Sequence, residues 1–234
     1  MLNIIPVLDL MNGIAVSGKS GSRNTYLPLK TVFSSSPDPY SIAKSLKMNG
    51  ANELYIADLD LIEKKDHNLD SVKMMNSVIP LILDVGVRNF DSFKFFLDFA
   101  FKVVVAAETI ESMEEFHKIF DKFPKERIVV SVDVKNNELY NISDDFNLSL
   151  DEFKEELIAI SPNEIILLDI SRVGTGNGVN IDLFNKFRDF KSSLILGGGL
   201  RKNDLNSVEN LGVRSVLVGT DLHNGEISLN SYSL

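Results

Sequence analysis

Acidic side chains recur at one kind of position in this chain, at the end of a short apolar run. Five aspartates occupy such positions: Asp9, Asp58, Asp84, Asp133 and Asp169. An unpaired carboxylate inside a strand costs on the order of several kcal/mol, so it is tolerated best where a strand ends at an opening. Carboxylates on opposite sides of one opening can act as general base and general acid on the same small molecule. The pattern therefore indicates proton-transfer chemistry.

A structural alternative exists for each aspartate, in which the carboxylate caps the next helix or binds loop amides. Asp58 and Asp84 fit that alternative as well as they fit a functional role. Asp9 and Asp133 end the first and fifth of eight expected strands, which are diametrically opposed in a closed eight-stranded barrel. We therefore predict that Asp9 and Asp133 are the catalytic pair.

Glycine-rich segments follow the seventh and eighth apolar runs. Glycine lets backbone amides approach an anion, and a helix that starts there favours negative charge. The loops after strands seven and eight are the recurrent phosphate site of barrel enzymes, although three glycines can also form a simple tight turn. We predict phosphate binding by Gly197, Gly198, Gly199, Gly219 and Thr220.

The connection after the first run is rich in hydrogen-bond donors. It reads Gly18-Lys19-Ser20-Gly21-Ser22-Arg23-Asn24. We expect it to close over an anionic ligand through Lys19 and Arg23, with a solvated loop as the equally weighted alternative. The histidines at positions 67, 117 and 223 have no metal-ligand spacing, and we predict neither a bound metal nor a cofactor.

Eight apolar runs rich in Val, Ile and Leu alternate with helical stretches. The runs are too continuous for half-exposed strands and are typical of parallel strands covered on both faces. They span residues 3–9, 53–58, 81–84, 103–107, 128–134, 164–170, 194–196 and 215–219. From caps such as Asp38, Asp91 and Ser149 we expect helices at 39–49, 92–99, 112–121, 149–160, 182–190 and 204–211.

Two similar segments lie half a chain apart. Gly86-Val87-Arg88 and Gly199-Leu200-Arg201 each follow an apolar run, and their offset of 113 (199 minus 86) is close to half of 234. Such an echo indicates two similar halves. Eight strand–helix units in a chain of this length predict a single (β/α)8 TIM barrel with a half-barrel repeat over residues 1–234. The alternative, a doubly wound open sheet, rarely needs eight strands in so short a chain.

The amino-acid composition indicates a globular protein and excludes several kinds of partner and chemistry. With 44% hydrophobic and 24% charged residues, the chain can bury a full core. A net charge of -9 argues against nucleic acid or an anionic membrane as a main partner, while anionic small substrates stay possible. The chain has no Cys, which excludes disulfides and thiol catalysis, and no targeting or membrane-spanning pattern. We expect a cytoplasmic protein whose oligomeric state is open.

Several segments together resemble one family. Ile5-Pro6-Val7-Leu8-Asp9-Leu10 with Asn12-Gly13 is similar to the start of the histidine-biosynthesis barrels of the HisA/HisF family, the ProFAR isomerase and the imidazole glycerol phosphate synthase cyclase. The resemblance continues through nearly the whole chain, at Asp58-Leu59-Asp60, Gly86-Val87-Arg88, Val130-Ser131-Val132-Asp133, Asp169-Ile170-Ser171-Arg172, Gly197-Gly198-Gly199 and Val218-Gly219.

This resemblance implies a (β/α)8 barrel and assigns the acid/base roles to Asp9 and Asp133. The isomerase of the family performs an Amadori-type aldose-to-ketose rearrangement. Its substrate carries two phosphates, one held by each half-barrel. The cyclase has a glutaminase partner, which nothing in this sequence indicates.

The chain departs from the family at three places. After strand three the family has Gly-Gly-Gly-Ile-Arg, whereas this chain has Asp84-Val85-Gly86-Val87-Arg88. A carboxylate beside a phosphate repels it by roughly several kcal/mol at low effective dielectric, so we predict that this phosphate half-site is lost. At strand six Leu168 and Val173-Gly174-Thr175 replace a Thr and an Asp-Gly-Thr segment, and the Trp that the isomerase commonly uses is absent.

We therefore expect a divergent HisA-like enzyme, similar to a subgroup found mainly in archaea. It would be an isomerase of the aldose–ketose type that acts on a phosphorylated small molecule with one phosphate site. Asp169 or Asp84 would replace the missing phosphate contact by binding an amine or hydroxyls. If the chain is instead an authentic ProFAR isomerase, Arg88 would hold the second phosphate.

Two further alternatives come from different classes of function. Clustered carboxylates at one opening could hold Mg²⁺ for metal-assisted chemistry. The protein could also be a non-catalytic one that binds a phosphorylated metabolite, in which the aspartates have only structural roles.

Overall fold

The computed structural model describes residues 2–18, 25–143 and 146–229. Its centre is a ring of eight parallel strands, in which β11 pairs with β1 and so closes the barrel. In ring order these strands are β1 (Asn3–Met11), β4 (Leu54–Asp58), β5 (Leu81–Asp84), β6 (Lys102–Ala106), β7 (Ile128–Lys135), β9 (Ile165–Asp169), β10 (Leu194–Gly197) and β11 (Ser215–Val218). The predicted (β/α)8 TIM barrel is confirmed, and each predicted apolar run forms one of its strands.

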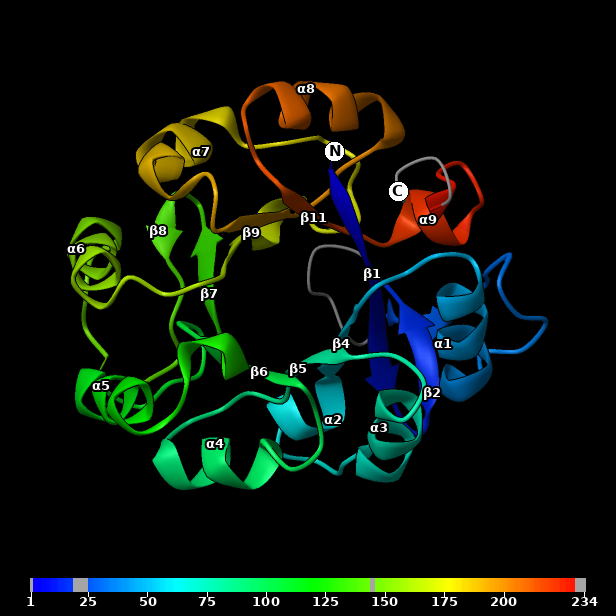
Figure 1. Cartoon of the computed structure of the whole chain (residues 1–234), viewed down its shortest axis with the longest axis horizontal. Helices are drawn as coiled ribbons and strands as arrows, with labels where there is room; N and C mark the ends of the chain where they lie inside the picture. The colour runs from blue at the N-terminus through cyan, green and yellow to red at the C-terminus, as the bar shows by residue number, and fades with distance from the viewer. Residues whose placement is uncertain (1, 19–24, 144–145, 230–234) are drawn as a thin grey trace.

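Helices surround the ring of strands, as Figure 1 shows. They are α1 (Pro39–Met48), α2 (Leu59–Ile62), α3 (Leu69–Asn76), α4 (Phe90–Phe96), α5 (Met113–Lys122), α6 (Leu150–Ile160), α7 (Ile181–Phe187), α8 (Leu205–Asn210) and α9 (Thr220–His223). The sequence reading did not include α2, α3 and α9. Two of these, α2 and α9, are single turns directly after a strand, too short to give an apolar periodicity.

Helix caps explain where the longer helices begin. The Asp38 carboxylate accepts a hydrogen bond from the Ser41 N–H at 2.8 Å, as predicted. Ser149 and Glu152 form a reciprocal capping box at the start of α6. The prediction that Asp91 caps a helix at 92–99 was wrong, because that helix is α4 and Asn89 caps it by accepting from the Ser92 N–H.

Three short antiparallel strands extend the barrel. These are β2 (Ile14–Ser17), which pairs with β1, β3 (Leu27–Pro28), which pairs with β2, and β8 (Glu138–Leu139), which pairs with β7. β2 and β8 run alongside the carboxyl-terminal residues of β1 and β7, and β3 lies on the far side of β2. They therefore lie at the end of the barrel where the strand-end aspartates lie.

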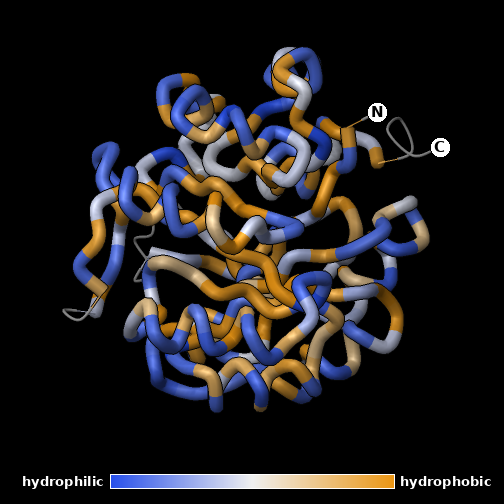
Figure 2. The backbone as a smooth tube through the Cα atoms, turned by 60° about the vertical axis from the view of Figure 1, so that its left-hand side comes forward, coloured by the Kyte–Doolittle hydropathy of each residue, from blue (hydrophilic) through white to orange (hydrophobic). Residues whose placement is uncertain are grey.

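Two apolar layers form the core. The larger lies between the strands and the helices, and the smaller fills the barrel with inward side chains such as Ile5, Ile82 and Val129. Figure 2 shows the hydrophobic strands at the centre and alternating hydropathy along the surrounding helices. At the amino-terminal end of the barrel, Lys102 forms ion pairs with Glu53 and Glu164, at 3.0 and 2.7 Å.

Among the described helices, none has both the length and the apolar composition that crossing a membrane requires.

Candidate active site

Alternation along each strand decides which strand-end aspartates face the barrel interior. Asp84 lies two residues after the inward Ile82, and Asp9 and Asp133 each lie four residues after an inward Ile5 or Val129. Successive side chains of a strand point to opposite faces, so all three carboxylates point into the barrel mouth. The same count turns Asp58 and Asp169 outward, toward the helices.

Asp133 is the most deeply buried carboxyl of the mouth, with 3% of its surface exposed. The Ser131 hydroxyl donates to its Oδ1 at 2.9 Å, and the Glu108 N–H donates to its Oδ2 at 3.3 Å. Burial raises the pKa of Asp133 to about 8, aided by the charges of Glu108 and Asp84 and opposed by the two hydrogen bonds. At neutral pH this carboxyl is protonated and can donate a proton.

Tyr55 lies at the floor of the mouth, on β4. Its hydroxyl donates to Asp84 Oδ2 at 2.9 Å. Burial raises the pKa of the Tyr55 hydroxyl well above its usual value, and the charges of Asp84, Asp133 and Asp9 add to that effect. All three carboxylates are thus close enough to the Tyr55 hydroxyl to raise its pKa, which places them around a single opening.

The sequence reading missed Tyr55. A lone aromatic residue within an apolar strand is most often core, and 7% exposure fits that interpretation. A usable signal was its position: Tyr55 is three residues before the outward Asp58, so the strand alternation turns it inward.

Asp84 contacts the loop that follows it. Its Oδ1 accepts a hydrogen bond from the Gly86 N–H at 3.1 Å, while its Oδ2 accepts from Tyr55. The cap of α4 is Asn89, so Asp84 does not begin the following helix. Of the two alternatives for Asp84, helix cap or mouth residue, the geometry supports the mouth.

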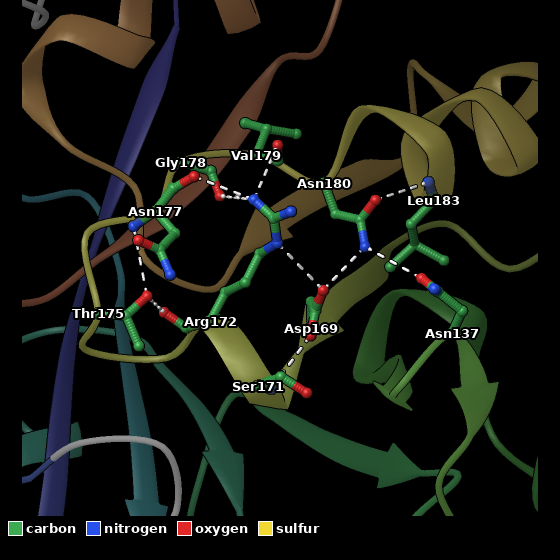
Figure 3. Close-up of polar contacts among 10 residues, drawn as sticks. All are labelled: Asn137, Asp169, Ser171, Arg172, Thr175, Asn177, Gly178, Val179, Asn180 and Leu183. Atoms are coloured by element: carbon green, nitrogen blue, oxygen red, sulfur yellow. Dashed lines mark hydrogen bonds and ion pairs between the residues drawn. The ribbon is translucent and has the colours of Figure 1, made fainter.

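Asp169 lies on the outer side of the barrel, as Figure 3 shows. Its Oδ2 accepts from Asn180 Nδ2 at 2.8 Å and pairs with Arg172 Nε at 3.3 Å, while Oδ1 accepts from the Ser171 N–H. Asn180 in turn caps α7. The carboxylate that we expected to bind substrate is thus engaged in holding the loop between β9 and α7.

Asp58 has an equivalent arrangement in the first half-barrel. Its carboxylate accepts from the Leu61 N–H at 3.2 Å and from the backbone and side-chain N–H groups of Asn68, at 2.7 and 2.8 Å. Asn68 stands at the start of α3, as Asn180 stands at the start of α7. In both halves, an outward aspartate therefore binds the asparagine that directly precedes a helix, α3 in the first half and α7 in the second, which supports the half-barrel repeat.

Arg172 organises the loop after β9 (Figure 3). Its Nη1 donates to the carbonyl oxygens of Asn177, Gly178 and Val179. The Thr175 hydroxyl donates to the Arg172 carbonyl oxygen at 2.7 Å. The glycine-rich segment 174–178 is consequently held against the barrel by several hydrogen bonds.

Of the three basic residues predicted to bind substrate, the structure describes Arg88. The Arg88 Nη2 donates to the carbonyl oxygen of Ile62 at 3.2 Å, which ties the loop after β5 to the end of α2. Lys19 and Arg23 lie outside the described residues.

The predicted phosphate segments follow β10 and β11. Gly199 has a φ of +74°, and a Cβ there would collide with the carbonyl oxygen of Arg172, so close packing of the loop after β9 already requires glycine. Gly219 differs, because a Cβ there would meet nothing within 4 Å. Thr220, next to it, is exposed. Open space next to backbone amides is compatible with a bound anion.

In the part of the chain that the structure describes, no group of three or more His, Asp or Glu side chains is arranged to hold a metal ion.

Comparisons with known proteins agree with this architecture. Residues 3–228 match the model of a family described as histidine biosynthesis protein. An uncharacterized protein of Methanocaldococcus jannaschii is 38% identical over 97% of this chain and 96% of its own length. Enzymes named as an imidazole-4-carboxamide isomerase (ProFAR isomerase) are also similar. The one from Leuconostoc mesenteroides is 25% identical over 97% of this chain and 96% of its own. The one from Clostridium botulinum is 28% identical over 97% of this chain and 94% of its own. This chain belongs to the histidine biosynthesis protein family.

Proposed function

We propose that this protein is an isomerase that moves protons within a small phosphorylated molecule, with Asp9 and Asp133 as its acid/base pair. The observation that carries the proposal is Asp133, a buried carboxyl with a pKa of about 8 in the same mouth as Asp9. An aldose-to-ketose rearrangement needs one group that gives a proton and another that takes one. The relatives named as isomerases support this reaction type.

The proposed reaction uses the two carboxyls in turn. Asp133 gives its proton to the ring oxygen of an amino-sugar substrate, and the C1–O bond breaks to leave a C1=N double bond. Asp9 then removes the proton from C2. The C2–H electron pair forms a C1=C2 double bond while the π pair of the C1=N bond returns to the nitrogen, which gives an enaminol. C1 finally takes the proton from Asp9 while the C2 hydroxyl returns its proton to Asp133. Protons and electrons balance, so the chemistry itself consumes nothing besides substrate.

We further propose that the substrate phosphate binds to Gly197, Gly198, Gly199, Gly219 and Thr220. The open space at Gly219 and the exposed Thr220 hydroxyl support this assignment. Lys19 and Arg23 are proposed to contact the same anionic ligand. The absence of Cys supports a cytoplasmic location for such an enzyme.

A single phosphate site is the finer part of the proposal. The Asp84 carboxylate already accepts the hydrogen bond of the Gly86 N–H, which is a donor that a second phosphate would need. A carboxylate at that point also repels a dianion. We therefore propose that Asp84 contacts the part of the substrate that carries hydroxyl or amino groups, whereas Asp169 acts by shaping the loop after β9.

Turnover of ProFAR by the purified protein tests the proposal, with Asp9→Asn as the control. No turnover of ProFAR, together with protection of the protein against heat by inorganic phosphate, would support a repurposed isomerase with one phosphate site. Turnover that Asp9→Asn abolishes would identify the histidine-pathway isomerase instead, and a second phosphate site would then follow. Absence of both turnover and phosphate protection would contradict either enzyme and favour a non-catalytic role.

A further inference from the structure

An ion pair joins the two loops that carry the proposed phosphate segments. Arg201 follows Gly199 by two residues, and Asp221 follows Thr220 directly. Arg201 Nη1 donates to Asp221 Oδ1 at 2.6 Å, and the Lys202 N–H donates to Asp221 Oδ2 at 2.9 Å. Both oxygens of one carboxylate in the first turn of α9, directly after β11, are thus bound by donors from the loop after β10.

A third loop, the one after β9, also contacts this ion pair. A Cβ at Gly176 would collide with the Arg201 guanidinium, so the loop after β9 passes directly against it. That loop is tied to the β10 loop by a hydrogen bond from the Gly178 N–H to the Gly199 carbonyl oxygen, at 3.1 Å. Arg201 is consequently the side chain at which the loops after β9, β10 and β11 come together.

Burial makes the pair sensitive to geometry. Asp221 is 1% exposed, so its charge is compensated by Arg201 and the Lys202 N–H rather than by water. The Arg201 side chain is 39% exposed, so one partner of the pair is buried and the other reaches solvent. Removal of a partner from a buried charge is costly, so the Asp221 carboxylate holds its donors in place. Side chains that fix a binding segment in this way are commonly as important as the residues that touch the ligand.

The other half-barrel lacks this device. Arg88 occupies the position equivalent to Arg201, yet its side chain binds the carbonyl oxygen of Ile62. Within residues 2–18, 25–143 and 146–229, no carboxylate pairs with Arg88. Among these described residues, such an ion pair therefore occurs in the half in which a phosphate site is proposed and not in the other.

We propose that Asp221 and Arg201 are positioning residues of the phosphate site, which hold its two glycine segments at the spacing that an anion needs. This inference rests on the proposed binding of phosphate by Gly197–Gly199 and Gly219-Thr220. It adds a pair of side chains that do not themselves have to touch the ligand.

Calorimetric titration with inorganic phosphate tests the inference in the wild type, Asp221→Asn and a control, Asp189→Asn. Asp189 is 76% exposed and pairs at 3.8 Å with Lys154, so the control removes the same charge at a distant surface. Loss of a negative charge by itself favours anion binding. We expect the opposite for Asp221→Asn, a loss of affinity of about 10-fold or more, with the control unchanged.

The outcomes separate the inference from the function on which it rests. Wild-type protein that binds no phosphate would overturn both. Phosphate binding that is equal in the wild type and Asp221→Asn would overturn only the positioning role, even if the variant melts at a lower temperature. If Asp221→Asn does not fold, Arg201→Lys replaces it, because the lysine keeps the charge but changes the reach. Weaker binding by Arg201→Lys is expected, and unchanged affinity would overturn the role.

Discussion

The loop after β5 and the loop after β10 occupy equivalent places in the two halves of the barrel. Each leaves a strand and runs through a Gly-apolar-Arg segment, Gly86-Val87-Arg88 in the first half and Gly199-Leu200-Arg201 in the second. The first begins with Asp84, whose carboxylate is bound to the Gly86 N–H. The second begins with Gly197, which has no side chain.

This difference divides the barrel mouth into two chemical regions. On the β5–β7 side, burial raises the pKa of Asp133, and the nearby charges of Glu108 and Asp84 raise it further. On the β10–β11 side, glycine segments are held by the Arg201–Asp221 pair. In the function proposed above, two halves with the same backbone pattern serve proton transfer and anion binding separately, because a few strand-end residues differ.

Among variants on the β5–β7 side of the mouth, Asp133→Asn should have the largest effect. It should lower the activity and raise the stability of the protein. Loss of the proposed proton donor should lower turnover of any accepted substrate by about 10²–10⁴-fold. The folded state keeps a proton on Asp133 up to a pH of about 8, whereas the unfolded chain loses it near 3.8, so stability falls as pH rises between these values. The variant should remove that loss and melt at a higher temperature at pH 8, measured by calorimetry.

The pH series supplies the control for this prediction. Well below pH 3.8, wild type and Asp133→Asn should melt at similar temperatures, because Asp133 is then protonated in both the folded and the unfolded chain. An Asp133→Asn variant that is less stable than wild type at pH 8 would show that burial does not dominate this carboxyl.

On the β10–β11 side of the mouth, alanine substitutions at Gly199 and Gly219 should have different effects. The first should disturb packing, and the second should disturb anion binding. Gly199→Ala combines a φ of +74° with a collision at the Arg172 carbonyl, so we expect a loss of roughly 2 kcal/mol or more in the free energy of unfolding. Gly219→Ala meets nothing within 4 Å, so its methyl group enters the space assigned to the phosphate. It should weaken phosphate binding and leave the unfolding free energy nearly unchanged. Denaturant unfolding and phosphate titration of both variants measure the two effects.

The strands of this barrel could be predicted from the sequence more fully than its site. Each barrel strand is an apolar run bounded by polar residues, and this signal needs no knowledge of the neighbours. Strand alternation also predicts the inward direction of Asp9, Asp84 and Asp133. The single-turn helices α2 and α9 gave no such signal, because their boundaries depend on hydrogen bonds made after the chain is folded.

The parts of the site that were missed depend on long-range contacts. Tyr55 is a mouth residue only because β4 lies beside β5, where its hydroxyl reaches Asp84. The Arg201–Asp221 pair joins residues 20 apart whose loops meet in the fold. Asp169 occupies a strand end as Asp133 does, yet it faces the helices because it is one residue further along the alternation. Residue type and strand position alone could not distinguish these cases.

Asp84→Asn and Ser131→Ala should shift the pH dependence of kcat/KM in opposite directions. The Asp84 charge raises the pKa of Asp133, and the Ser131 hydrogen bond lowers it. In the wild type, kcat/KM for an accepted substrate should fall above a pH of about 8 as Asp133 loses its proton. Asp84→Asn should move this fall to lower pH by up to about one unit, and Ser131→Ala should move it to higher pH. Shifts in the same direction for both variants would argue against Asp133 as the titrating group.

The smallest expected effect lies on α9, where stability should depend on pH in the opposite sense to Asp133. The His223 ring is 3% exposed; its Nε2 donates to the Val7 carbonyl oxygen at 2.9 Å, and its Nδ1 accepts from the Thr31 hydroxyl at 3.0 Å. Burial lowers the pKa of His223 below its usual 6.5, although the Val7 hydrogen bond opposes the shift. As the pH falls below 6.5, the unfolded chain takes up a proton on this histidine before the folded protein does, so the folded state loses stability. Unfolding free energies of wild type and His223→Gln between pH 7 and pH 5 isolate this contribution, since Asp133 and the other acids are common to both proteins. The gap between the two proteins should narrow as the pH falls, and a gap that stays constant would mean that His223 has the same pKa in both states.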